Sequence, residues 1–262
     1  MANGHGRGML PQVYDIPREF GSGLALLGLS WLGRQSTCTT RVAGGRPVVY
    51  LHGTGARAGS LAPLRWYQAA MGHGAGFVFD YDTTPDIDGA AFALAEYLDH
   101  VADRAPSAPG DPLTLAGHSL GGLIIRRYLQ LFPKHHPVER VFLLATPNYG
   151  TYLAHYFPTE VTTMMLPGSE FLEKLNDGSH LQDGIRYVSM YGDSDLFVLP
   201  RESMHLQGSE QVIFPGVGHN NIVLSPTVMS EISARLVPGF EQRVAAGTDF
   251  RPWHDEAAPA QG

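Results

Sequence analysis

The serine at position 119 lies in a pattern that is typical of nucleophilic catalysis. The segment 117–122 reads Gly-His-Ser-Leu-Gly-Gly and joins an apolar run to a stretch with helical periodicity. A Gly-x-Ser-x-Gly sequence is common by chance, and it gains meaning from this place between a strand and a helix. Glycines allow a sharp turn there, and a helix N-terminus favours developing negative charge. The pattern predicts a nucleophilic Ser119; the alternative is a Gly-rich helix start with an incidental serine.

A serine hydroxyl becomes a good nucleophile only when a base removes its proton. The chain has 12 histidines, and we predict that His219 is this base. It follows the last expected strand, and loops that leave the carboxyl ends of parallel strands meet at one edge of the sheet. His118 neighbours the serine, but adjacent side chains on a tight turn diverge. His135 and His136 close a helix and are expected to be exposed.

The histidine needs an acidic residue that fixes its tautomer and stabilises the imidazolium. Asp193 and Asp195 both follow an expected strand. We favour Asp195, because it lies farther into the loop and the apolar residues 196–198 after it could anchor it. Asp193 remains the alternative, although a turn-forming role suits it. The order Ser119, Asp195, His219 along the chain is the order expected of an α/β-hydrolase.

Two backbone N–H groups are candidates for stabilising a tetrahedral oxyanion. Leu120 follows the predicted nucleophile, and its N–H would supply one donor. The turn His-Gly-Thr-Gly at 52–55 leaves the first strong apolar run, so that the N–H of Thr54 would supply the second. The alternative for this turn is a Gly-rich loop without a catalytic role.

The elements that must position these residues alternate between strands and helices. The expected strands cover residues 47–51, 76–79, 113–116, 141–145, 185–190 and 211–214. The expected helices cover residues 61–71, 87–101, 120–132 and 226–236. This alternation predicts a parallel sheet with helices on both faces. Arg126 and Arg127 are expected on the solvated face of their helix.

Five segments together resemble bacterial lipases and esterases of the α/β-hydrolase superfamily, in particular small lipases with a compact sheet. The segments are residues 52–55, 117–122, 145–151, 194–195 and 218–219. The resemblance covers about residues 46–237, which is most of the chain. It implies carboxylic-ester hydrolysis through an acyl-enzyme on Ser119, without a cofactor. It also implies that Thr54 and Leu120 donate to the oxyanion.

The stretch from about 147 to 183 has no expected strand and is too long for a plain connection, so we expect a helical insertion or a lid. Its many apolar side chains could line an acyl pocket or simply pack as ordinary core. The residues that we assign tentatively to substrate binding are His52, Tyr152, Phe157, Met164 and Met165.

The domain organisation follows from length and composition. A chain of 262 residues with 44% hydrophobic and 16% charged residues is expected to be globular with a sizeable core. We predict one α/β-hydrolase domain over residues 46–240, a flanking or packed N-terminal extension over 1–45, and a C-terminal tail over 241–262.

Several classes of function are disfavoured by charge and composition. The formal net charge of −7 argues against nucleic-acid binding, which needs clustered Lys and Arg. The single cysteine, Cys38, cannot form an intramolecular disulfide or a multi-cysteine zinc site. The carboxylates between 80 and 88 lack the EF-hand register, since Pro85 and Ala91 stand where Gly and Glu are needed. We therefore expect no metal.

No apolar run is long enough to span a bilayer, so we expect no transmembrane segment. Without a clear leader sequence a cytoplasmic location is favoured, and secretion is the alternative.

These observations predict a serine esterase or lipase that acts on a small-molecule or lipid ester, with contact to a lipid interface as a further possibility. A thioesterase, a polyester depolymerase or an acyltransferase would use the same residues and stays open. A non-catalytic protein that binds an apolar ligand is a remote alternative, because such a protein would not need a complete set of catalytic groups.

Overall fold

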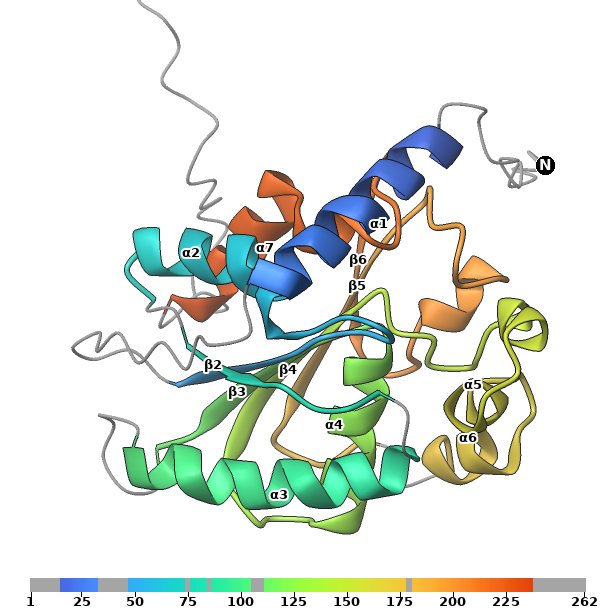
Figure 1. Cartoon of the computed structure of the whole chain (residues 1–262). Coiled ribbons are helices and arrows are strands. Elements are labelled where there is room, and N and C mark those ends of the chain that lie inside the picture. The colour runs from blue at the N-terminus through green and yellow to red at the C-terminus, as the bar shows by residue number, and fades with distance from the viewer. Residues whose placement is uncertain are drawn as a thin grey trace, which may run out of the picture.

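Six parallel strands form one sheet at the centre of the computed structural model (Figure 1). The structure describes residues 15–32, 47–73, 76–83, 86–104, 111–177 and 181–237; the predicted C-terminal tail and Cys38 lie outside them. The strands, in sheet order, are β2 (Phe77–Phe79), β1 (Val48–Leu51), β3 (Leu113–His118), β4 (Val138–Leu144), β5 (Arg186–Gly192) and β6 (Glu210–Phe214). The predicted parallel sheet is therefore confirmed.

The register of the sheet brings the carboxyl ends of its strands to one edge. Leu51 at the end of β1 pairs with Gly117 near the end of β3, and Gly192 at the end of β5 pairs with Phe214 at the end of β6. The loops that follow these strands contain the candidate site residues. Because all six strands run in the same direction, segments separated by more than 100 residues in the sequence meet at this edge.

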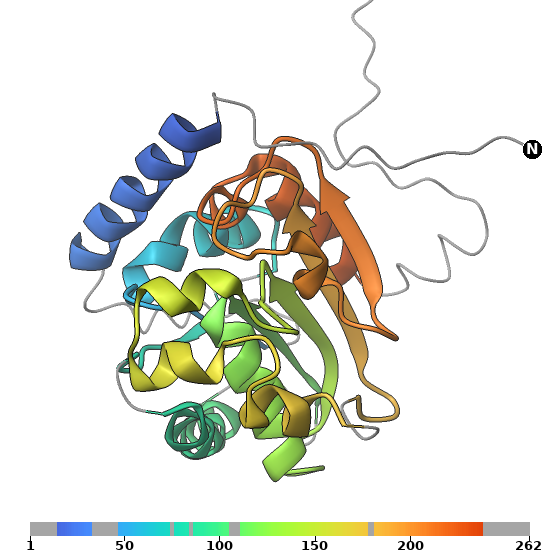
Figure 2. The ribbon, with the colours of Figure 1, turned by 90° about the vertical axis from the view of Figure 1, so that its right-hand side faces the viewer.

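Helices cover both faces of the sheet (Figures 1 and 2). On one face α3 (Ile87–Arg104) and α4 (Leu120–Leu131) share a core with β3 and β4. On the other face α2 (Ala62–Ala70) and α7 (Pro226–Leu236) pack on β1, β5 and β6. The 3₁₀ helices η1 (Ala58–Leu61) and η4 (Asn221–Val223) lie on this second face. Strands and helices agree with the sequence prediction to within about three residues.

The segment between β4 and β5 contains short helices instead of a strand. These helices are η2 (Tyr152–Tyr156), α5 (Glu160–Met164) and α6 (Glu170–Leu175), and η3 (Arg201–Met204) follows β5. Capping hydrogen bonds start two of them: the N–H of Thr162 donates to the Thr159 hydroxyl, and that of Leu172 donates to the Ser169 hydroxyl. Buried side chains of α5 and α6 belong to the same core as α3 and α4.

Arg126 corrects one expectation, because this side chain is almost fully buried on α4 rather than solvated. Its guanidinium donates to the backbone oxygens of Asn148 and Leu175 and to the side-chain oxygens of Asn148 and Asn176. Burial lowers the pKa of Arg126 to about 10. The guanidinium thus ties α4 to the segment after β4. Arg127, in contrast, is partly exposed and pairs with Asp88.

Helix α1 (Asp15–Leu32) lies within the predicted N-terminal extension and was not expected as an element. It packs against η1 and η4, and Leu26 joins the core under it. Its outer face carries a stripe of exposed apolar side chains at helical spacing, namely Ile16, Phe20, Leu24, Leu27 and Trp31. Among the described residues no helix is both long and apolar enough to cross a membrane.

Candidate active site

Ser119 lies at the turn between β3 and α4, and its backbone adopts φ 52° and ψ −117°. A positive φ is strained for a residue with a side chain and is found where surrounding structure enforces it. Two glycines make the turn possible. A Cβ at Gly117 would overlap the backbone of Gly121 and Gly122, and a Cβ at Gly121 would lie 2.7 Å from the carbonyl oxygen of Leu51.

The structure brings Ser119, Asp195 and His219 together in one hydrogen-bonded row. The Nε2 atom of His219 is 3.0 Å from the Ser119 Oγ, and its Nδ1 atom is 2.8 Å from an Asp195 carboxylate oxygen. All three side chains are buried. With the proton on Nδ1, the imidazole donates to Asp195 and its Nε2 accepts from the serine hydroxyl, which is the arrangement that activates a serine nucleophile.

Backbone N–H groups hold the carboxylate of Asp195. Its Oδ1 atom accepts hydrogen bonds from the N–H groups of Phe197 and Val198, both at 2.8 Å, while Oδ2 faces His219. Asp193, the alternative, instead accepts from the N–H of Gly216 at 2.7 Å and so joins two loops. Of these two aspartates, Asp195 is the one that contacts the histidine.

His118 contacts the backbone of the loop that contains His219. Its Nε2 atom is 3.0 Å from the carbonyl oxygen of His219. Burial, together with the nearby charge of His219, lowers the pKa of His118 to about 3. The ring is therefore neutral near pH 7 and its Nε2–H donates to that carbonyl. His118 thus holds the backbone of His219 without adding a charge to the site.

The pKa of His219 lies above its ordinary value. Burial by itself would lower it, but the charge and hydrogen bond of Asp195 and the charge of Glu19 outweigh that effect. A raised pKa means that the imidazole is already protonated at a pH where an exposed histidine is still neutral.

This shift predicts the pH dependence of an activity that uses His219 as a base. Since only the neutral ring accepts the Ser119 proton, kcat/KM should fall about tenfold per pH unit below a midpoint that lies above about 6.5. A pH profile with a soluble ester substrate measures this midpoint. A rate that stays level down to pH 5 would contradict the assignment of His219.

The two predicted oxyanion donors belong to segments that adjoin the nucleophile. Leu120 is the first residue of α4, so its N–H has no acceptor within the helix. The turn after β1 passes close to Ser119, since a Cβ at Gly53 would lie 3.2 Å from the Cβ of Ser119. Thr54 is the next residue of this turn and is exposed. An oxyanion between the two N–H groups could accept from both.

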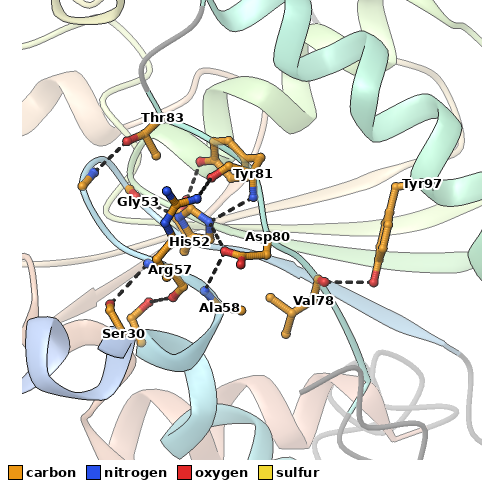
Figure 3. Close-up of polar contacts among 12 residues, drawn as sticks. Ser30, His52, Gly53, Arg57, Ala58, Val78, Asp80, Tyr81, Thr83 and Tyr97 are labelled. Carbon is orange, nitrogen blue, oxygen red and sulfur yellow. Dashed lines mark hydrogen bonds and ion pairs between the residues drawn. The ribbon is translucent and has the colours of Figure 1, made fainter. Parts of the chain in front are cut away.

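His52 is fully buried, which argues against its tentative assignment to substrate binding. Its Nε2 atom is 3.1 Å from an Asp80 oxygen, and the Tyr81 ring stacks on the imidazole with centroids 4.3 Å apart (Figure 3). The Tyr81 hydroxyl donates to the His52 carbonyl at 2.6 Å, and Asp80 accepts from the N–H of Ala58. These contacts fix the turn that contains Thr54 instead of reaching a substrate.

The other tentative substrate residues lie in different environments. Tyr152 and Phe157 are exposed, Met164 is partly buried, and Met165 is 6% exposed within the core. Met165 therefore packs in the core, which argues against its tentative assignment to substrate binding. Met164 lines a surface pocket together with Asp86, Asp88, Glu160 and Thr163.

The loop that contains Asp195 touches the segment that contains Tyr152. The Thr151 hydroxyl donates to the carbonyl of Phe197 at 2.8 Å, and the N–H of Tyr152 donates to the carbonyl of Leu199 at 2.8 Å. The ring of Phe197 lies with its centroid 5.2 Å from that of His219 and is 41% exposed. Phe197 thus belongs to the site, although the sequence indicated only that it could anchor Asp195.

One group of side chains could offer ligands to a metal ion, away from the row described above. Atoms of Asp99, His135 and His136 lie within 4.8 Å of one another. Both imidazole Nε2 atoms face the same Asp99 oxygen, at 3.4 and 3.0 Å. The His136 imidazole is within hydrogen-bond distance of Asp99, and the three side chains join α3 to the turn after α4.

Comparisons with known proteins identify the fold. No family model matches the sequence, and no curated protein matches it significantly. Among solved structures, lipase B of Aspergillus fumigatus aligns with a TM-score of 0.62 and 15% identity, over 77% of this chain. The chain spans only 55% of that protein's length.

The mature form of the lipase BlEst2 of Bacillus licheniformis aligns with a TM-score of 0.61 and 16% identity. This alignment covers 78% of the present chain and 96% of the bacterial protein. At such identities the likeness concerns the fold and not the substrate. The six-stranded parallel sheet, its helices and these neighbours together show that the chain has the α/β-hydrolase fold.

Proposed function

We propose that the chain is a serine hydrolase that cleaves carboxylic esters. The observation that carries this proposal is the row from the Ser119 Oγ through His219 to Asp195, with Ser119 on a strained turn at the carboxyl edge of the sheet. Neighbours that are named as lipases support the ester as the substrate class.

The reaction would proceed in two steps through an acyl-enzyme. Ser119 Oγ attacks the ester carbonyl carbon while His219 takes the hydroxyl proton, and the N–H groups of Thr54 and Leu120 stabilise the oxyanion. The carbon–oxygen bond to the alcohol then breaks, and the alcohol leaves with the proton from His219. A water molecule, deprotonated by His219, then attacks the acyl carbon. The bond between that carbon and Ser119 Oγ breaks, the Oγ takes the proton back from His219, and the carboxylic acid leaves.

Apolar side chains near the site support a substrate with an acyl chain and contact with a lipid interface. Phe197 and Leu199 are exposed on the loop after Asp195, and Tyr152, Tyr156 and Phe157 are exposed on the adjacent segment. Helix α1, which packs against η4 after the His219 loop, carries its exposed apolar stripe on its outer face. Side chains of this kind favour apolar ligands over charged ones.

A panel of p-nitrophenyl esters with increasing acyl length, with and without emulsified triglyceride, tests the proposal. We expect turnover of several esters by the wild-type protein and none above background by Ser119→Ala. A rate that rises once the substrate forms an emulsion would support contact with a lipid interface. Equal rates for wild type and Ser119→Ala would refute ester hydrolysis at this site.

Two substitutions separate acyl binding from core packing. Phe157→Ala removes an exposed ring and is expected to change the preferred acyl length by two or more carbons, with the free energy of unfolding nearly unchanged. Met165→Ala should leave that preference unchanged and lower the free energy of unfolding by about 2–5 kcal/mol, because it opens a cavity in the core. Chain-length profiles and urea titrations measure the two effects. An unaltered profile for Phe157→Ala would argue against an acyl site there.

A further inference from the structure

Helix α1 places a buried carboxylate beside the His219 loop. Glu19 is 4% exposed, although most of the residues around it on α1 face solvent. One of its oxygens accepts a hydrogen bond from the N–H of Asn220 at 3.3 Å. The other oxygen is buried and has no hydrogen-bond partner among the described residues. Burial of a carboxylate with an unpaired oxygen lowers the stability of the fold, so we expect a specific interaction to offset this loss of free energy.

The backbone of the His219 loop is shaped to admit this carboxylate. A Cβ at Gly218 would overlap the Oε1 atom of Glu19, so the space that a side chain would take at 218 is filled by the Glu19 carboxylate. Glu19 therefore contacts the loop on both sides of the histidine, at the Cα of Gly218 and at the N–H of Asn220. Residues about 200 positions apart in the sequence form this contact.

The charges around the imidazole come from several elements. Asp195 follows β5, His118 ends β3, and Glu19 comes from α1, while Asp193 and Arg18 lie close to Gly216 at the start of the loop. Burial raises the pKa of Glu19, and the nearby charge of His219 acts against this. His118 is neutral near pH 7 and adds no charge. The charges that raise the pKa of His219 are those of Asp195 and Glu19.

We propose that Glu19 is a positioning residue for His219: its carboxylate holds the loop 218–220 in place, and its negative charge favours the imidazolium that forms when Ser119 is deprotonated. The proposal rests on the proposed function as far as catalysis is concerned. The effect of Glu19 on the charge state of His219 does not depend on it.

Helix α1 also forms a hydrogen bond near the turn that contains Thr54. The N–H of Arg57 donates to the hydroxyl of Ser30 at 3.2 Å, and Arg57 follows the turn that contains Thr54 (Figure 3). Helix α1 thus joins the histidine loop near one end and the turn with the predicted oxyanion donor near the other. Only the Glu19 end brings a charge to the imidazole, so that the two contacts can be separated by mutation.

The test is the titration of His219 by NMR together with the pH profile of kcat. Glu19→Gln removes the charge and keeps nearly the same shape, so the pKa of His219 should fall by about one unit. At the pH plateau kcat should fall at least fivefold, because the imidazolium is less stabilised, with KM changed less than twofold. A lower pKa combined with a lower plateau rate is not expected from a loss of stability alone.

Matched variants define the controls. Ser30→Ala removes the other contact of α1, and Glu96→Gln removes one exposed carboxylate on α3, across the sheet; neither should move the pKa of His219 by more than about 0.2 units. Glu19→Asp keeps the charge and should shift the pKa less than Glu19→Gln does. If Glu19→Gln does not fold, Glu19→Met, an uncharged side chain of similar length, takes its place: a His219 pKa within about 0.2 units of the wild-type value would contradict the proposal.

An unchanged His219 pKa and an unchanged plateau kcat in folded Glu19→Gln would overturn the proposal. The titration needs no substrate, so its outcome is distinct from a failure of ester hydrolysis. If the wild-type protein cleaves no ester while Glu19→Gln still lowers the pKa of His219, then the proposed function fails and the electrostatic part of the inference stands.

Discussion

Replacing His219 by alanine is expected to lower kcat for ester hydrolysis by about four to six orders of magnitude. Without the imidazole, neither Asp195 nor His118 can take the Ser119 proton, because Asp195 lies on the far side of the ring and His118 donates to a carbonyl. Binding and the oxyanion donors would remain, so KM should change little. Steady-state kinetics with a p-nitrophenyl ester, combined with circular dichroism to verify folding, measure this loss.

His100→Ala is the matched control for this variant. His100 is an exposed histidine on α3, and its Nδ1 atom lies 2.8 Å from the carbonyl oxygen of Glu96 in the same helix. We expect its kcat to stay within twofold of the wild-type value. A His219→Ala protein that keeps more than one hundredth of the wild-type rate would show that another group is the base.

The second large effect is expected for Asp195→Asn, which should lower kcat by about 10⁴-fold. The amide keeps the size of the side chain but loses the charge, and its NH₂ group can face His219. The ring would then carry its proton on Nε2, where it cannot accept from Ser119. Above the wild-type midpoint the full loss should appear, whereas below it the loss should be smaller, because the variant also lacks the charge of Asp195 that raises the pKa of His219.

Asp193→Asn separates the two carboxylates of this loop. The side-chain oxygen of asparagine can still accept from the N–H of Gly216, so kcat should fall less than tenfold. Comparable losses for the two variants would contradict the assignment of Asp195. The two residues lie two positions apart in the same loop, and circular dichroism of both variants verifies that each is folded.

The sheet and its edge could be predicted because two independent patterns coincide. Alternating apolar runs and helical periods indicated parallel strands, and parallel strands place their following loops together. Ser119, Asp195 and His219 each follow a strand, so their meeting is a consequence of topology. The choice between Asp193 and Asp195 depends on backbone N–H groups whose positions become known only in the folded loop.

Glu19 could not be predicted because its role depends on where α1 packs. The helix has an apolar stripe that faces solvent, so its amphipathic pattern does not show which side is buried. The environments of Arg126 and His52 could not be predicted for a related reason. Charged or polar residue types suggest exposure or contact with a ligand, whereas both side chains are buried and have polar partners inside the protein. Burial of such groups is decided by partners distant in sequence.

The most direct measurement of the central claim is covalent labelling with a fluorophosphonate, followed by peptide mass spectrometry. A phosphonate attached to the oxygen of Ser119 in the wild-type protein, and no labelling of Ser119→Ala, is the predicted result. Labelling should slow as the pH falls and His219 becomes protonated. An unlabelled wild-type protein, or a label at another residue that persists in Ser119→Ala, would contradict the account.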